Sequence, residues 1–341
     1  MSIHPTAVIH SQAVLGAGVT IGPLAVIEQG AVLGDGCTIH AHAFVGGSVT
    51  LGKNCTVGHG AVLCGDPQDF AFKPQVRSRV VIGESNMIRE HVTIHRGTAE
   101  GSETVVGDGC TVHAHAFVGG HVTIGKNCTV GHGAMLGGDP QDFAFKPQVR
   151  SRVVIGDGTK MFESVTIHRG TSEDSETVVG DGCFLMGGVH LAHNVRLGSG
   201  VIIANNALLA GHVQVADGVF IGGGSVFHQH MRIGRLAICQ GASGFGKDIP
   251  PFVIAAEING VAGLNVVGLR RAGLDAATRA EIKRAFGLLY RSGKNTSQAI
   301  AAAHAAEWTA AGHEFWDFVA AAKKRGLCDW LGGRRGAVGG E

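Results

Sequence analysis

The chain has 341 residues, of which 55 are Gly, while only 16% are charged and 6% are aromatic. Gly does not recur at every third position, which excludes collagen, and regularly spaced aliphatic residues exclude a disordered chain. A net charge of +1 gives no electrostatic basis for nucleic-acid binding. The sequence has no run of about 18 apolar residues and no secretory signal at its start. We therefore expect a cytoplasmic protein without stable membrane insertion.

An aliphatic residue recurs at every sixth position along most of the chain. This rhythm runs from Ile3 to Leu63 without a break, resumes at Ile82 and continues with interruptions to Cys239. An α-helix needs a period of 3.6 residues and would not tolerate so much Gly. A six-residue period with an aliphatic anchor predicts a mainly β protein, a parallel β-solenoid with three short strands per coil.

A longer repeat overlies the short one. Residues 37–109 and 110–182 align without gaps, with 59 of 73 positions identical, which predicts a tandem duplication that lengthens the solenoid. Each copy contains the polar, Pro-containing segment GDPQDFAFKPQVRSR. We expect these two segments to leave the solenoid as loops, at residues 65–79 and 138–152.

Four segments follow from these patterns: a β-helix over residues 1–248, a connector over 249–274, a helical cap over 275–331 and a disordered tail over 332–341. We expect three cap helices, from Asp275 to about Arg291, from about residue 296 to Ala310, and over residues 313–325. Their N-cap residues would be Asp275 for the first helix and Thr296 or Ser297 for the second. Such a cap would cover the open edge of the last coil.

Five of the eight cysteines share one position of the six-residue repeat, where Ala, Val or Ser stand elsewhere: Cys37, Cys55, Cys110, Cys128 and Cys183. We interpret them as small buried residues in a reduced protein. No CxxC pair occurs, which argues against a zinc ribbon.

Histidines are concentrated in residues 185–230. Stacking successive coils brings His193, His212 and His228 to within about one position of one another, with Gly211 one coil after His193. A His is suited to proton transfer near neutral pH, and a Gly exposes its backbone N–H to an oxyanion. Together these groups indicate acyl transfer to a hydroxyl.

Other interpretations of the histidines are open. Three His side chains could bind Zn²⁺, as in the solenoid carbonic anhydrases, although no Cys or carboxylate completes the set. A purely structural solenoid would not need such a local concentration. Isolated histidines elsewhere are expected to be solvated turn residues: His4, His10, His40, His42 and His59.

Several longer motifs point to one family: PQDF, VTIHRGT, LMGGVHLAHN, IIANNALLAGHV, VFHQ, DIPPFVIA, GLNVVGLRR and LLYRSGK. In them the chain resembles the UDP-N-acetylglucosamine O-acyltransferases that start lipid A synthesis, over nearly its whole length once one copy of the duplication is discounted. The resemblance implies a left-handed β-helix with a helical cap, assembled as a homotrimer. It also implies transfer of an (R)-3-hydroxyacyl chain from acyl carrier protein to the glucosamine 3-hydroxyl. The chain would need no cofactor of its own, because the donor is carried on the phosphopantetheine of the carrier protein.

The resemblance also assigns roles to residues. It implies that His193 is the general base and Gly211 the oxyanion donor. The residues that it implies for substrate binding are His190, His212, His228 and Gln229 in the β-helix, Asn265, Arg270 and Arg271 near the nucleotide, and Asp142, Lys146 and His168 on the loop side.

The chain departs from the family at three points. Asn194 follows His193 where the family often has Asp, and an amide stabilises imidazolium less than a carboxylate does. Val267 stands where a carboxylate is common. The loop is about one residue longer than in common members, which makes Lys146 a less specific match.

Three alternatives stay open. The N-acyltransferase of the same pathway shares the AHN sequence but usually has a uridine-binding domain before its solenoid, whereas here the repeats begin at Ile3. A sugar O-acetyltransferase that uses acetyl-CoA would not explain YRSGK or the loop. A lengthened scaffold, engineered or decayed, would fold without turnover.

The duplication predicts one active site rather than two, because Gly120 and His121 stand 73 residues before His193 and Asn194. His193→Ala should abolish acyl transfer from 3-hydroxyacyl carrier protein to UDP-N-acetylglucosamine, since a positioned base contributes about 10²–10⁴-fold. His95→Ala, in the first copy, should leave transfer nearly intact. Equal losses in the two variants would contradict this assignment.

Overall fold

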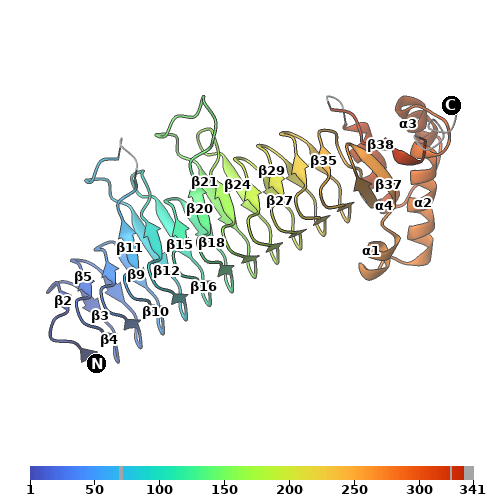
Figure 1. The fold of residues 1–341 in the computed structure, drawn as a ribbon. Coiled ribbons are helices and arrows are strands. Elements are labelled where there is room, and N and C mark those ends of the chain that lie inside the picture. Colours follow the sequence, from blue (N-terminus) through green and yellow to red (C-terminus); the bar gives the residue numbers. More distant parts are fainter. Residues whose placement is uncertain (69–71, 323–324, 334–341) are drawn as a thin grey trace. The chain divides into compact units, whose positions relative to one another are not determined.

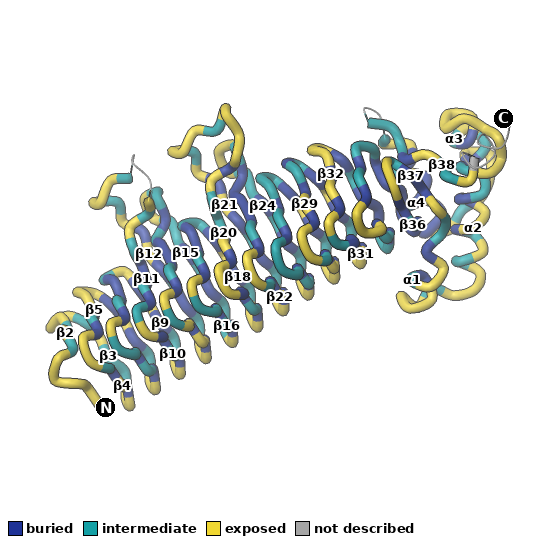
Figure 2. Tube along the Cα trace, in the orientation of Figure 1, coloured by how far each residue is buried: buried dark blue, intermediate teal, exposed yellow. Residues whose placement is uncertain are grey.

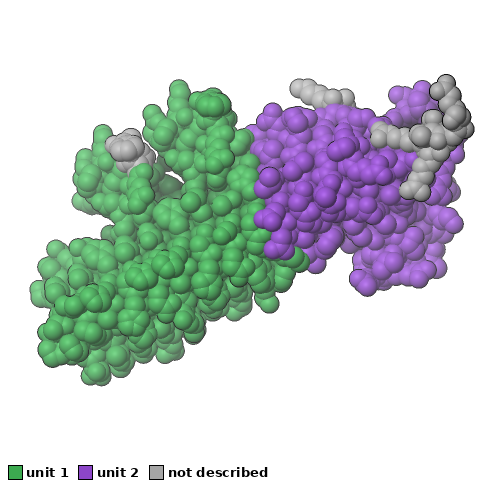
Figure 3. Space-filling model, viewed as in Figure 1, with its two compact units in different colours: residues 1–196 green, residues 197–341 purple. Residues whose placement is uncertain are grey.

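The computed structural model describes residues 1–68, 72–322 and 325–333 (Figure 1). The chain divides into two compact units, residues 1–196 and 197–341, which are coloured separately in Figure 3. The predicted fold class, a left-handed parallel β-helix followed by an α-helical cap, is confirmed.

Unit 1 consists of three parallel sheets, each built from every third strand. The first sheet contains β1 (Ser2–Ile3), β4 (Thr20–Ile21), β7 (Thr38–Ile39), β10 (Thr56–Val57), β13 (Met87–Ile88), β16 (Thr111–Val112), β19 (Thr129–Val130), β22 (Lys160–Met161) and β25 (Phe184–Leu185). The second contains β2 (Val8–Ile9), β5 (Val26–Ile27), β8 (Phe44–Val45), β11 (Val62–Gly65), β14 (Thr93–His95), β17 (Phe117–Val118), β20 (Met135–Gly138), β23 (Thr166–His168) and β26 (His190–Leu191). The third contains β3 (Val14–Leu15), β6 (Val32–Leu33), β9 (Val49–Leu51), β12 (Arg79–Ile82), β15 (Glu103–Val106), β18 (Val122–Ile124), β21 (Arg152–Ile155) and β24 (Glu176–Val179), and β27 (Arg196–Leu197) lies at the unit boundary.

The six-residue rhythm is the burial pattern of these strands (Figure 2). After the first coil, most repeats bury the aliphatic residue and the small residue two positions before it, as in the pairs Ala25 with Ile27 and Ala31 with Leu33. Some corners between strands require a left-handed backbone, with φ of 60° at His42 and 56° at Asn54. His, Asn and Gly are favoured there because other side chains are strained in this conformation.

The five cysteines of the repeat occupy the small buried position, as predicted. All eight cysteines of the chain are buried and none is in a disulfide. The thiol of Cys37 donates to the carbonyl oxygen of Gly52 at 3.0 Å, and that of Cys55 donates to Gly83 at the same distance. The thiols therefore act as small apolar groups that also satisfy a carbonyl of the neighbouring coil.

The two polar segments leave the solenoid where the sequence predicts. The first loop runs between β11 and β12, and the second between β20 and β21. Figure 1 shows both as protrusions from the coils of unit 1.

Unit 2 contains further coils and the cap. Its parallel strands are β28 (Ile202–Ile203), β29 (Leu208–Leu209), β30 (Gln214–Val215), β31 (Phe220–Ile221), β32 (Val226–Phe227), β33 (Arg232–Ile233), β34 (Ile238–Cys239) and β35 (Gly244–Phe245), and they continue the same order of strands. They are followed by β36 (Val253–Ala256), β37 (Gly260–Leu264), α1 (Val266–Arg271), α2 (Ala276–Tyr290), α3 (Thr296–His304), α4 (Ala310–Ala320), β38 (Asp329–Trp330) and a 3₁₀ turn (Leu331–Gly333).

The cap packs on the last coils through one apolar cluster. Phe252, Phe315 and Ile282 are fully buried in it. Beside this cluster Arg235 forms a forked ion pair with Glu314 of α4, with its closest contact at 2.8 Å. Burial of the cluster, rather than this half-exposed pair, holds the cap in place.

The cap differs from the prediction in its details. Residues 249–274, predicted as a connector, hold β36, β37 and α1. The helix predicted to end near Ala310 ends at His304, and its N-cap is Asn295, which forms a capping box with Gln298. The third helix begins and ends earlier than predicted. Of the predicted disordered tail, residues 334–341 lie outside the described residues.

The fully buried Phe252 tests how the cap is held. We expect Phe252→Ala to lower the free energy of unfolding by about 3–5 kcal/mol through loss of apolar burial and a cavity. All three Trp residues lie in the cap, so Trp fluorescence during urea unfolding reports this part of the chain. The control Val267→Ala, at an exposed position, should change the value by no more than about 0.5 kcal/mol. An effect of Phe252→Ala as small as that of the control would contradict the expectation.

Candidate functional site

The second-copy loop is fixed by one buried arginine. Arg169 is 6% exposed and pairs with Asp139 at 2.9 Å. It also donates to the carbonyl oxygen of Pro147 at 2.7 Å and stacks on the ring of Phe145 at 4.8 Å. Its donors and its charge are therefore directed at the loop, which is held against the coils.

The first copy repeats this arrangement. Arg96 pairs with Asp66 at 2.8 Å, donates to the carbonyl oxygen of Pro74 at 2.9 Å and lies 4.8 Å from the ring of Phe72. The two loops are thus held by the same set of contacts.

Two predicted site residues on the loop side, Asp142 and Lys146, are exposed. The carboxylate of Asp142 accepts the backbone N–H of Ala144 at 2.9 Å, so it orders the loop. The carbonyl oxygen of Lys146 accepts the N–H of Val149 at 3.1 Å. Loop geometry therefore presents both side chains to solvent.

His168 and His190, both predicted as substrate-binding residues, lie together. Their rings meet edge to face at 4.8 Å, and Nδ1 of His190 lies 2.7 Å from Oγ1 of Thr166. Burial lowers the pKa of His168 to about 4, helped by the nearby His190 and His193, and burial also lowers the pKa of His190. Both rings are neutral at pH 7 and suit hydrogen bonding rather than charge pairing. Nδ1 of His168 is buried without a hydrogen-bond partner among the described residues.

The tautomer of His193 follows from its neighbours. Oδ1 of Asn194 accepts the backbone N–H of Thr171 at 3.2 Å and the Thr171 hydroxyl at 3.0 Å. A backbone N–H can only donate, so the amide oxygen rather than its nitrogen must face this side. Nδ1 of His193 lies 3.0 Å from the same oxygen and must therefore carry the proton. This places the lone pair on Nε2, which is the arrangement that a general base needs.

A second histidine pair lies in unit 2. The rings of His212 and His230 stack at 4.4 Å, and both residues have a left-handed backbone, with φ of 62° and 63°. The carbonyl oxygen of Gly211 accepts the N–H of His230 at 2.9 Å. The sequence interpretation missed His230, although its position one coil after His212 is visible in the repeat.

His228 and Gln229 of unit 2 are exposed. Nδ1 of His228 lies 3.3 Å from the carbonyl oxygen of Gln229. Both side chains are therefore open to a ligand on the surface of unit 2.

Asn265, Arg270 and Arg271 lie at the two ends of α1. Asn265 is buried and caps the helix: its oxygen accepts the N–H of Gly268 at 2.8 Å, and its nitrogen donates to the carbonyl oxygen of Leu236 at 2.8 Å. Arg270 and Arg271 are exposed in the last turn. The geometry gives Asn265 a helix-capping contact and leaves the two guanidinium groups available for an anionic ligand.

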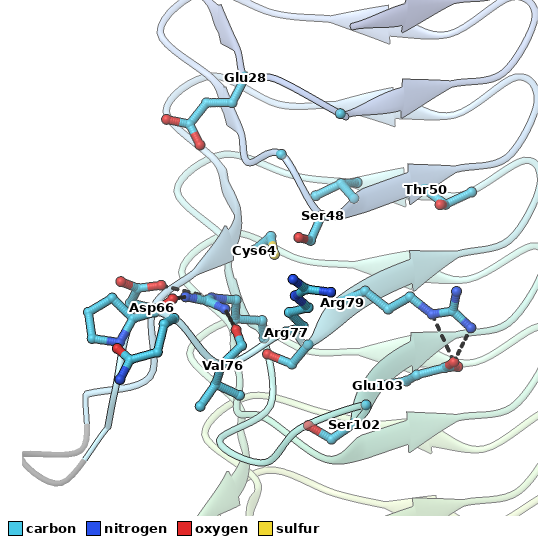
Figure 4. A pocket seen from close by; sticks show the side chains of 18 residues that line it. Glu28, Ser48, Thr50, Cys64, Asp66, Val76, Arg77, Arg79, Ser102 and Glu103 are labelled. Atoms are coloured by element: carbon cyan, nitrogen blue, oxygen red, sulfur yellow. Dashed lines mark hydrogen bonds and ion pairs between the residues drawn. The ribbon is translucent and has the colours of Figure 1, made fainter. Parts of the chain in front are cut away.

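A cavity of about 810 Å³ lies beside the first loop, away from the predicted site residues (Figure 4). Among its lining residues Arg79 pairs with Glu103 (Figure 4). Arg96, which also lines it, pairs with Asp66. The corresponding cavity of the second copy measures about 240 Å³ and includes His121 in its lining. Three acidic and three basic side chains are among the described lining residues of the larger cavity, so their formal charges balance.

The described residues show neither a metal-binding cluster nor a membrane-spanning helix. In the described part of the chain, no group of three or more His, Cys, Asp or Glu side chains is arranged to hold a metal ion. No helix within the described ranges has both the length and the apolar composition that crossing a membrane requires.

Family models match three parts of the chain. Residues 248–328 match the model described as UDP N-acetylglucosamine O-acyltransferase, domain 2. Residues 103–138 and 176–211 match the bacterial transferase hexapeptide model. Residues 1–99 match the model of the GMPPB C-terminal domain.

Curated relatives carry the name acyl-[acyl-carrier-protein]–UDP-N-acetylglucosamine O-acyltransferase. The chain is 33% identical to the protein of Gloeothece citriformis over 163 residues, 48% of this chain and 59% of that protein. It is 41% identical to that of Halorhodospira halophila over 42% of this chain and 56% of the relative, and 39% identical to that of Burkholderia orbicola over 48% and 62%. The matches thus span less than two thirds of each relative.

Solved structures cover more of the chain. The UDP-N-acetylglucosamine acyltransferase of Arabidopsis is 27% identical, with a TM-score of 0.63 over 96% of this chain and 100% of that one. The enzyme of the same name from Campylobacter jejuni is 26% identical, with a TM-score of 0.57 over 96% and 99%. The resemblance predicted from the sequence is thereby confirmed: this chain is similar to UDP-N-acetylglucosamine O-acyltransferases in sequence and in fold.

Proposed function

We propose that the protein is an acyltransferase that moves an (R)-3-hydroxyacyl chain from acyl carrier protein to the 3-hydroxyl of UDP-N-acetylglucosamine, the first step of lipid A synthesis. The names of the curated relatives and the match of residues 248–328 support the reaction. The observation that carries the mechanism is the hydrogen bond of His193 with Asn194, which fixes the tautomer that a general base requires.

The proposed reaction needs one base and one oxyanion donor. Nε2 of His193 removes the proton of the sugar hydroxyl while the hydroxyl oxygen attacks the thioester carbonyl. The tetrahedral intermediate carries its negative charge on the former carbonyl oxygen, which the backbone N–H of Gly211 stabilises. Collapse breaks the carbon–sulfur bond, and His193 returns the proton to the departing phosphopantetheine thiolate. A positioned general base typically raises the reaction rate by about 10²–10⁴-fold, and one oxyanion donor raises it by about 10²–10³-fold.

The repeat supports the choice of Gly211. Gly138 stands 73 residues earlier, next to a shift of strand register between Leu136 and Gly138. Gly138 lines one cavity together with His95 and Gly120, which stand 73 residues before His168 and His193. The three positions that precede His168, His193 and Gly211 by one repeat therefore lie around one cavity.

Asn194 replaces the carboxylate that often follows the base in related proteins. Its oxygen is a neutral acceptor held by Thr171. It orients the ring of His193 but supplies no charge to stabilise imidazolium. We therefore propose orientation, rather than charge stabilisation, as the role of Asn194.

The other proposed contacts follow the chemistry of the substrates. Arg270 and Arg271 offer guanidinium groups for the diphosphate of the nucleotide or the phosphate of the carrier protein. The further residues that we propose for substrate binding are His168, His190, His212, His228, Gln229, Asn265, Asp142 and Lys146. The protein is proposed to act as a homotrimer in the cytoplasm and to need no cofactor.

Replacing Asn194 by Asp tests the proposed role of its side chain. A carboxylate beside His193 would favour imidazolium, so the acidic limb of the kcat/KM profile should move to higher pH, by on the order of one unit. Transfer from 3-hydroxyacyl carrier protein to UDP-N-acetylglucosamine is measured across the pH range. The control Asn54→Asp places the same change at another left-handed corner and should leave the profile in place. An unmoved profile in Asn194→Asp would rule out His193 as the titrating base, and absence of transfer in the wild-type protein would overturn the proposed function.

A further inference from the structure

A cavity of about 390 Å³ lies at the first junction, where the first copy of the repeat meets the second. The geometry points to a second ligand-binding site here, which takes an uncharged, apolar chain and does not turn it over. This inference goes beyond the proposed function and rests on it only for the identity of the chain, a 3-hydroxyacyl group.

The cavity is built from the counterparts of the proposed active site. Five of its lining residues stand 73 positions before five proposed or neighbouring active-site residues. The pairs are His95 with His168, Phe117 with His190, Gly120 with His193, His121 with Asn194, and Gly138 with Gly211. The structure therefore shows these register positions gathered around one hollow.

The framework contacts are conserved between the two junctions. Thr98 offers its N–H and hydroxyl to Nε2 of His121 at 3.1 and 3.0 Å, as Thr171 does to Asn194. His95 meets Phe117 edge to face at 4.9 Å, as His168 meets its neighbour in the second copy. The side chains around the cavity are thus held by contacts that recur at the second junction.

The base is what the first junction lacks. A Cβ atom at Gly120 would lie 2.6 Å from the carbonyl oxygen of Arg96 and 2.8 Å from the Cα atom of Gly97. Both are backbone atoms, so no side chain fits there without a backbone shift. His121 does not substitute for the base, because its Nε2 accepts the N–H of Thr98. A ligand can bind at this junction without meeting a base.

The lining determines the class of ligand. Phe117 and Met135 provide apolar surface, and several glycines leave the walls open. Among the described lining residues, Asp139 and Arg169 carry charge at pH 7 and pair with each other. Burial lowers the pKa of His121 to about 4 and lowers that of His95, so both rings are neutral. An ionic ligand would lose its hydration without finding an unpaired opposite charge, whereas an apolar chain gains by burial.

The probe is a radiolabelled long-chain 3-hydroxyacyl pantetheine, which is uncharged, and its binding to the full chain is measured by equilibrium dialysis without sugar acceptor. The wild-type protein should bind two equivalents per chain. Met135→Glu places a carboxylate at the mouth of the cavity, on a side chain that is 42% exposed, and should weaken this site more than about tenfold, leaving one equivalent. The matched control Met87→Glu, at a 43% exposed methionine outside the lining, should leave two.

The outcomes separate this inference from the proposed function. Equal binding by the wild-type protein and Met135→Glu would overturn the inference. One equivalent in the wild type and none in Met135→Glu would uphold it, while showing that the proposed active site does not take the chain. Transfer activity should be unchanged in Met135→Glu, and its loss would count against a silent site. As a check that does not depend on folding of the variant, a diazirine at the chain end should label residues 117–138 of the wild-type protein, and absence of label there would also overturn the inference.

Discussion

The packing of one aliphatic and one small residue per six-residue repeat is the constraint on which this structure depends. Ile27 and Ala25 illustrate it: both are buried, and Ile27 lies in register with Ile9 and Val45 of the neighbouring coils. A parallel ladder then fixes the register, because a slip of one residue would turn the aliphatic side chain outward. Every feature that recurs along the β-helix, including the corner residues and the two arginine-anchored loops, inherits its position from this register.

Much of the fold could be predicted for this reason. The six-residue spacing of the aliphatic residues predicted the coils, and the loss of this spacing predicted both loops. The repeat position of Cys37 and its equivalents predicted that these cysteines are buried. The region after Ser243 was harder, because there the tertiary contacts decide the structure. Strands β36 and β37 pair with each other and with β38 near the end of the described chain, and no local pattern predicts such pairing.

In the candidate site, too, residue types and repeat positions could be predicted from the sequence, whereas contacts between distant residues could not. His193 was predicted from its residue type, its register and a family resemblance, all of which are visible in the sequence. Its tautomer was not, since that depends on Thr171, which lies 23 residues before Asn194 and reaches it only through stacking of the coils. The contacts of Asn265 could not be predicted either, because its amide caps α1 and also donates to the carbonyl oxygen of Leu236, 29 residues earlier.

The register has a further consequence for the two copies of the repeat. Cys37 and Cys110 both begin a copy, occupy the same interior position and are followed by Thr at the same place in the first sheet. The coil that precedes residue 37 would thus find nearly the same residues to pair with at the start of either copy. Each copy of the repeated segment adds its strands to the same three sheets and brings its own loop and its own hollow. Growth of the chain by such modules adds surfaces on which binding can diverge, without a new solution to the packing of the interior.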